Sequence, residues 1–148
     1  MALTMLDKTP AASTNSTWST EIATEFVRES KNPNGCVGQR LLSESDRVRV
    51  WEIRLKPGER FGFHRHMLDY FWSCSTGGTA RAHLNDGTTM DHTYQPGETR
   101  HETHAKGHYK VHDIQNTGAA ELHFTTVEFL DSANAPLALP EEIRRAAA

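Results

Sequence analysis

The sequence has little cysteine and no long apolar run, and each shortage excludes a class of protein. Two cysteines among 148 residues give little reason to expect a disulfide framework. The longest apolar runs are far shorter than the roughly 20 residues of a transmembrane helix. The first residues, MALTMLDKTPAAS, also lack the basic flank and apolar block of an export signal. We therefore expect a cytoplasmic protein that does not bind membranes.

A strong charge of either sign is missing as well. The formal net charge is −3, and lysines and arginines are scattered singly along the chain. Such a distribution gives no basic patch for nucleic acid or for an anionic membrane surface. Serine-nucleophile, Walker and dinucleotide-binding motifs are also absent from the sequence. Since nucleic acid and membranes are not indicated as partners, we expect a small-molecule substrate.

What the chain does have is a series of short strand-like runs separated by turn signals. Hydrophobic residues make up 36% of the chain, which is enough for one compact core. Over about 36–130 the runs recur at intervals of about 8 to 12 residues, and Asn85-Asp86-Gly87 is a hairpin signal between two of them. This spacing is typical of an all-β sandwich or barrel.

The two ends of the chain differ from this pattern. Residues 1–17 are rich in Ser, Thr and Ala without periodicity, which predicts a flexible arm. Apolar residues from Trp18 to Lys31 recur at helical spacing and predict a short helix, with an edge strand as the alternative. Near the other end, Pro140 is placed to begin a short helix. We therefore expect an arm over 1–17, one domain over 18–130 with its barrel over about 36–130, and a tail over 131–148.

Histidine is unusually frequent, with nine in the chain, and His64 and His66 lie one residue apart inside a strand-like run. Alternate side chains of a strand point to the same face, about 6.5 to 7 Å apart along the backbone. Both imidazoles can therefore converge on one metal ion. The alternative is that the pair arose by chance in a histidine-rich chain and either packs in the core or faces solvent.

The residues around this pair resemble the first motif of the cupin superfamily. Gly58, His64-x-His66 and Gly77 have the spacing of that motif. One position departs from it, because Tyr70 stands where cupins usually carry glutamate. The stretch also resembles small single-domain cupins of the kind associated with β-alanine degradation.

The second cupin motif is similar to His112-Asp113-Ile114-Gln115-Asn116, which follows the turn Pro96-Gly97-Glu98. The His-x-x-x-Asn spacing selects His112 as the third histidine of the site, whereas the usual distance from Gly97 selects His108. We prefer His112, because the turn and strand after Asn116 then fall where the last turn and strand of a cupin lie.

The resemblance implies both a fold and a cofactor. The expected fold is all-β, a cupin jelly-roll barrel of two antiparallel sheets with a short N-terminal helix or arm. Two chains are expected to form a homodimer in which the arm crosses to the partner. The expected cofactor is one divalent metal per chain, held by His64, His66 and His112. Fe(II) is favoured, and Mn(II), Ni(II), Zn(II) and Cu(II) also suit imidazole ligands. Asp69 is the alternative fourth ligand, although strand alternation turns it away from the histidines.

Further residues are assigned to the substrate. Tyr70 shares the strand parity of the histidine pair, so it is predicted to be catalytic through a hydrogen bond to a metal-bound substrate or dioxygen. Ordinary core packing is the alternative for this tyrosine. The residues predicted to line the substrate pocket are Trp72, Arg81 and His108. A solvated surface position is the alternative for Arg81. Three further histidines are interpreted as exposed loop residues, with a proton relay or an alternate metal ligand as the alternatives: His101, His104 and His108.

Three functions are compatible with such a site. The first is a dioxygenase-type enzyme, because an all-neutral ligand set leaves the full +2 charge on the metal and favours a small oxygen-bearing or carboxylate substrate. The second is a non-redox lyase, isomerase or hydrolase in which the metal acts as a Lewis acid. The third is a cupin that binds a small molecule without turnover. Oxygen consumption by the iron-loaded protein separates the first from the other two.

Overall fold

The structure is a computed structural model and describes residues 17–147. The predicted arm over 1–17 lies outside these residues except for Thr17. In the described range, the elements in chain order are α1 (Thr20–Lys31), β1 (Arg40–Glu44), β2 (Val48–Leu55), β3 (Arg60–His66), β4 (Asp69–Cys74), β5 (Gly78–His83), β6 (Thr89–Tyr94), β7 (Glu98–Glu102), β8 (Lys110–Asn116), β9 (Leu122–Phe129) and α2 (Glu141–Ala147). Neither of these two helices is long and apolar enough to cross a membrane.

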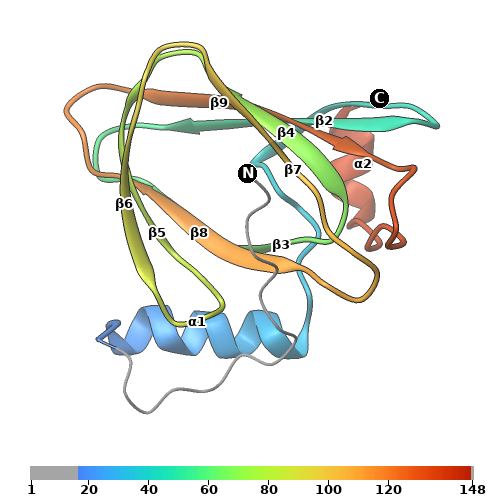
Figure 1. Cartoon of the computed structure of the whole chain (residues 1–148), viewed down its shortest axis with the longest axis horizontal. Coiled ribbons are helices and arrows are strands. Elements are labelled where there is room, and N and C mark those ends of the chain that lie inside the picture. The colour runs from blue at the N-terminus through green and yellow to red at the C-terminus, as the bar shows by residue number, and fades with distance from the viewer. Residues whose placement is uncertain (1–16, 148) are drawn as a thin grey trace.

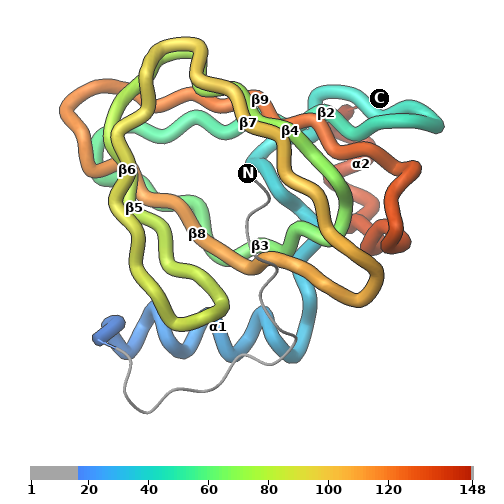
Figure 2. The backbone as a smooth tube through the Cα atoms, in the orientation of Figure 1, coloured from blue at the N-terminus to red at the C-terminus, as the bar shows by residue number. Residues whose placement is uncertain are grey.

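The strands form two antiparallel sheets. One sheet has the order β1-β2-β9-β4-β7, and the other has the order β3-β8-β5-β6. Figures 1 and 2 show the sheets facing each other as the two walls of a barrel, with α1 along the outside of the four-stranded wall and α2 beside the β1 edge. The prediction of an all-β jelly roll with a short N-terminal helix is confirmed.

Helix α1 begins and ends at the residues that the sequence indicates. The Ser19 side chain caps the N-terminus by accepting a hydrogen bond from the backbone N–H of Ile22. Lys31 lies in the last turn, where a positive charge complements the helix dipole. Because the next residues include Pro33, the helix does not continue. The helix interpretation of this segment is therefore confirmed over the alternative of an edge strand.

The apolar side chains form three clusters. The cluster between the two sheets contains Ile53, Leu55, Cys74, Ala80, Ile114, Leu122 and Phe124. The cluster between α1 and the outer face of the four-stranded sheet contains Phe26, Phe63, Tyr109 and Val111. The cluster around Val37, Leu41 and Trp51 is covered by residues at and before α2, among them Ile143. Both faces of the four-stranded sheet are therefore packed, which holds β3 and β8 rigidly in place.

Candidate metal centre

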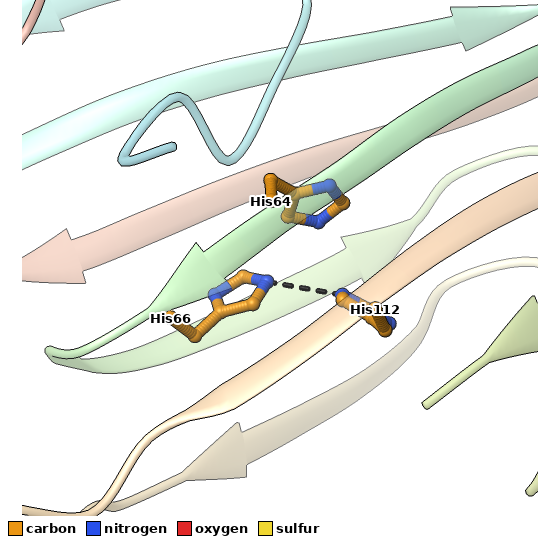
Figure 3. Close-up of side chains that lie close together, drawn as sticks. All are labelled: His64, His66 and His112. Atoms are coloured by element: carbon orange, nitrogen blue, oxygen red, sulfur yellow. Dashed lines mark hydrogen bonds between the residues drawn. The ribbon is translucent and has the colours of Figure 1, made fainter. Parts of the chain in front are cut away.

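The structure brings His64, His66 and His112 together inside the barrel. His64 and His66 lie on β3 and His112 on β8, where antiparallel pairing places it directly opposite His64. One ring nitrogen from each of the three lies within 4.8 Å of the other two. Figure 3 shows the three rings converging between the strands, with the Nε2 atoms of His66 and His112 3.0 Å apart. The third histidine of the cluster is His112, and His108 is not part of it.

A β-bulge in β3 gives His64 its inward direction. Phe61 pairs with Ile114 and His64 with His112, so β3 contains one more residue than β8 between these two pairs. Without the extra residue, a spacing of three would turn Phe61 and His64 to opposite faces of the sheet. With the bulge both rings point inward, and their centroids are 4.8 Å apart.

The same bulge fixes the tautomer of His64. Its Nδ1–H donates to the carbonyl oxygen of Gly62 over 2.9 Å, which leaves the lone pair on Nε2. Burial lowers the pKa of His64 to about 4. Burial also lowers the pKa values of His66 and His112 well below the usual range, and the neighbouring histidines and Lys110 lower them further. All three imidazoles are therefore neutral at pH 7, which is the form that binds metal.

These residues fit a divalent metal ion. Two imidazole nitrogens that bind one ion at about 2.1 Å and at a right angle lie about 3 Å apart, and the Nε2 atoms of His66 and His112 have this separation. His64 and His66 are 1% and 3% exposed, so few water molecules compete for their nitrogens. The alternative that the histidine pair faces solvent is excluded by this burial.

Tyr70 lies on the opposite wall from His66, since β3 and β4 belong to different sheets. We predicted that Tyr70 faces inward because it lies on the same strand face as His66. This reasoning was wrong, since the two residues lie on different strands, but the ring does face inward. The Tyr70 ring stacks on the His66 ring with centroids 4.0 Å apart and planes at 17°. Because Nδ1 of His66 is buried and has no hydrogen-bond partner among the described residues, this ring stacking is what orients His66 on that side.

The hydroxyl of Tyr70 belongs to a buried polar network with Glu102 and Lys110. It donates to the carboxylate of Glu102, which also accepts hydrogen bonds at 3.0 and 3.1 Å from Nζ of Lys110. Burial raises the pKa of Tyr70 well above its usual value, with a further contribution from the carboxylate of Glu102. The hydroxyl proton is thus donated to Glu102, and the predicted hydrogen bond between Tyr70 and a metal-bound ligand stays a prediction.

Sequence reasoning missed Glu102 and Lys110. The alternation of side chains along a strand was the available signal. Lys110 lies two residues before His112 and therefore faces the barrel interior as His112 does. A lysine that points into a barrel requires a buried anion. The identity of that anion depends on the pairing of Tyr70 with Glu102 across β4 and β7, which local sequence does not reveal.

The remaining predicted residues lie away from the cluster. The Asp69 carboxylate accepts a hydrogen bond from the backbone N–H of His104 over 2.9 Å, and this aspartate is not among the clustered ligand groups. His104 is buried, so its interpretation as an exposed loop histidine was wrong. His108 is half-buried, and only His101 of the three is exposed. The side chain of Asn134 holds this loop in place through hydrogen bonds with the backbone of Ala105, Gly107 and His108.

A cavity of about 40 Å³ adjoins the three histidines. Its other lining residues are Val37, Ile53, Tyr70, Trp72, Tyr94, Ile114, Phe124 and Thr126. Trp72 lines it as predicted, whereas Arg81 and His108 do not. Arg81 lies on the outer face of the sheet, where it is half-exposed and pairs with Asp91 at 2.8 Å. The alternative interpretation of Arg81 as a surface residue is therefore the correct one.

The remaining motif positions have structural roles. The Asn116 side chain donates to the carbonyl oxygens of Leu55 and Ala120 and accepts from the N–H of Gly118, which ties three segments together. Gly58 has a φ of +84°, a conformation that residues with a Cβ rarely adopt. The motif thus defines turns that place the β3 and β8 histidines.

The solved structures similar to this chain include a cupin domain. A cupin domain from Bordetella pertussis Tohama I is 24% identical, the match covers 66% of this chain and 95% of that one, and the TM-score is 0.53. An uncharacterized conserved protein with a double-stranded β-helix domain from Klebsiella pneumoniae is also 24% identical, over 68% of this chain and 76% of that one, with a TM-score of 0.49. No protein-family model and no curated protein matches the chain. The likeness to the Bordetella domain shows that this chain has the cupin fold, as its motifs predict.

Proposed function

We propose that this chain is a metal-dependent enzyme of the dioxygenase type that acts on a small oxygen-bearing or carboxylate metabolite. The observation that carries the proposal is the convergence of His64, His66 and His112 within 4.8 Å in the barrel interior. These three residues would hold one divalent ion, with Fe(II) as our first choice. When bound, such an ion supplies a Lewis-acidic centre on which a chelating substrate is activated toward dioxygen.

The donor set supports this type of chemistry. Three neutral imidazoles suit Fe(II), as they suit other first-row metals. No carboxylate belongs to the clustered group among the described residues, so the ligands do not offset the +2 charge. An anionic oxygen ligand therefore binds the metal more favourably in this site than in a site that contains aspartate or glutamate.

Residues around the cluster hold a ligand histidine in position and keep bulk water out of the site. The Tyr70 ring packs against His66 and limits its rotation. Ile53, Ile114 and Phe124 give the cavity apolar walls that exclude bulk water, which strengthens electrostatic interactions in the site. Tyr70 remains our proposed catalytic residue through a hydrogen bond to a metal-bound substrate or dioxygen. Homodimerisation stays a prediction.

Oxygen uptake by the anaerobically Fe(II)-loaded protein tests the proposal. We expect uptake on addition of a small hydroxy, oxo or enolisable carboxylic acid from a metabolite panel, and no uptake by the His64→Ala variant. His101→Ala is the matched control, because His101 is exposed and lies outside the cluster. Turnover with Zn(II) or Ni(II) but no oxygen uptake would contradict the proposal in favour of a lyase, isomerase or hydrolase. Tight metal binding with no turnover of any compound would favour a binding protein instead.

A further inference from the structure

We infer that the site accepts small monoanions with an uncharged body, and that Trp72 sets the upper limit of their size. The inference rests on the proposed metal centre and deepens it by naming the substrate class. It follows from the volume of the cavity, the chemistry of its wall and the position of Trp72.

The volume restricts the ligand to a few heavy atoms. The cavity measures about 40 Å³. An engineered apolar cavity of about 150 Å³ holds one benzene molecule, and a single water needs at least about 10–15 Å³. The space beside the histidines is therefore too small for an aromatic ring, and suits a ligand of the size of formate or acetate.

The wall restricts the charge of the ligand. Among the described residues, those that line the cavity include no lysine, arginine, aspartate or glutamate. Arg81 is outside, and Lys110 is committed to Glu102 beyond the hydroxyl of Tyr70. One anionic head can be neutralised at the metal centre, but a second charge on the body of the ligand would be buried without a partner. Such burial is strongly unfavourable, so dicarboxylates and zwitterions with a remote charge are rejected.

Trp72 is the side chain whose removal enlarges this space with least damage to the site. It projects from β4 and meets Tyr94 of β6, on the opposite sheet, edge to face with ring centroids 5.2 Å apart. A second edge-to-face contact joins it to Phe124 at 5.9 Å. The indole is half-buried and lies outside the histidine cluster, and within residues 17–147 it makes no hydrogen bond with the Glu102 network. It therefore bounds the cavity without holding the histidines.

The visible absorption spectrum of the Co(II)-loaded protein reports ligands that reach the metal. We expect formate to perturb the spectrum of the wild type and benzoate to bind at least tenfold more weakly. In Trp72→Ala we expect benzoate to bind at least tenfold more tightly than in the wild type, with formate unchanged within about threefold. Trp72→Phe, which keeps an aromatic side chain, should be intermediate and is available if the alanine variant does not fold.

Phe71→Ala is the matched control, since Phe71 is the neighbouring residue on β4 and contacts His101 and Phe129 on the outer face of the sheet. It should leave both anion affinities unchanged. Butyrate and succinate test the charge rule in Trp72→Ala, because they have the same number of carbon atoms and differ by one carboxylate. Succinate should bind at least tenfold more weakly than butyrate.

The possible failures are distinguishable. If Co(II) does not bind the wild type, or gives the same spectrum with His64→Ala, the proposed metal centre is wrong. If Co(II) binds through the histidines but the wild type accepts benzoate as tightly as formate, the size limit is wrong. An unchanged benzoate affinity in Trp72→Ala removes the role of Trp72, and equal binding of butyrate and succinate removes the charge rule.

Discussion

Replacement of Lys110 with methionine tests the buried ion pair beside the histidine cluster. The side chains of Lys110 and Glu102 are 11% and 9% exposed, and Nζ lies 3.0 Å from the carboxylate. In Lys110→Met the carboxylate loses both of its contacts with the ammonium group, and of its described partners it keeps the hydroxyl of Tyr70. The remaining charge is then buried and largely unpaired.

The expected loss of stability is large for this reason. Breaking a buried pair by removing one partner costs about 3–5 kcal/mol, most of it from the uncompensated charge. The double variant Lys110→Met, Glu102→Gln removes that charge and keeps a hydrogen-bond acceptor for Tyr70. We therefore expect the double variant to recover to within about 1–2 kcal/mol of the wild type, since replacing both partners can be nearly neutral.

Urea denaturation measures these free energies of unfolding, and the slope of the unfolding free energy against urea concentration should be the same in all variants. The matched control is Arg81→Met, because Arg81 and Asp91 form a pair of similar length, 2.8 Å, with side chains 48% and 64% exposed. Exposed pairs contribute about 1 kcal/mol or less. A cost for Lys110→Met no greater than that for Arg81→Met would refute the reasoning, as would a double variant less stable than Lys110→Met alone.

Three further predictions concern stability. Burial raises the pKa of Glu128 from 4.5 to about 7. The folded state therefore binds the proton of Glu128 more tightly than the unfolded state, so this one group should lower stability by about 3 kcal/mol as pH rises from about 4.5 to about 7. The buried neutral histidines of the cluster act in the opposite direction over the same range. Glu128→Gln should therefore gain stability relative to the wild type as pH rises over this range, and a difference in Tm between the two proteins that does not change with pH would contradict the assignment. Asn134→Ala removes an amide whose Oδ1 accepts one partly buried hydrogen bond and whose Nδ2 donates to three carbonyl oxygens, so it should cost about 2–4 kcal/mol in urea. A loss below about 1 kcal/mol would show that the loop does not depend on this side chain. Gly58→Ala should cost about 1–2 kcal/mol by thermal denaturation through backbone conformation alone, since a Cβ there meets nothing within 4 Å, and an unchanged Tm would contradict this.

Much of the fold was predictable because its signals are local. The spacing of two histidines on one strand, the positive-φ glycine at Gly58 and the hairpin at Asn85-Asp86-Gly87 all act over a few residues. His112 was also identified correctly as the third member of the cluster, from the spacing of its own motif rather than from its distance to the preceding turn.

The contacts that sequence reasoning missed depend on which strands meet in space. The turn at Met67 and Leu68 sends the chain from one sheet to the other, so strand alternation cannot be carried from His66 to Tyr70. Arg81 was expected in the pocket, but its inward or outward direction is set by the pairing of β5 with β8. Burial of His104 depends on a loop held by Asn134, which is distant in sequence. Pairing between remote strands is a property of the whole fold, which explains why local patterns do not reveal it.

The central claim is that three imidazoles from two strands hold one ion. Isothermal titration of the untagged protein with Zn(II), compared with His112→Ala and with the exposed-residue control His101→Ala, tests it most directly. We predict one site per chain in the wild type and in His101→Ala, and an affinity at least about 100-fold weaker in His112→Ala, since even residues that only support a ligand contribute 10–100-fold. Equal affinity in His112→Ala and the wild type, or no binding to the wild type, would contradict the account.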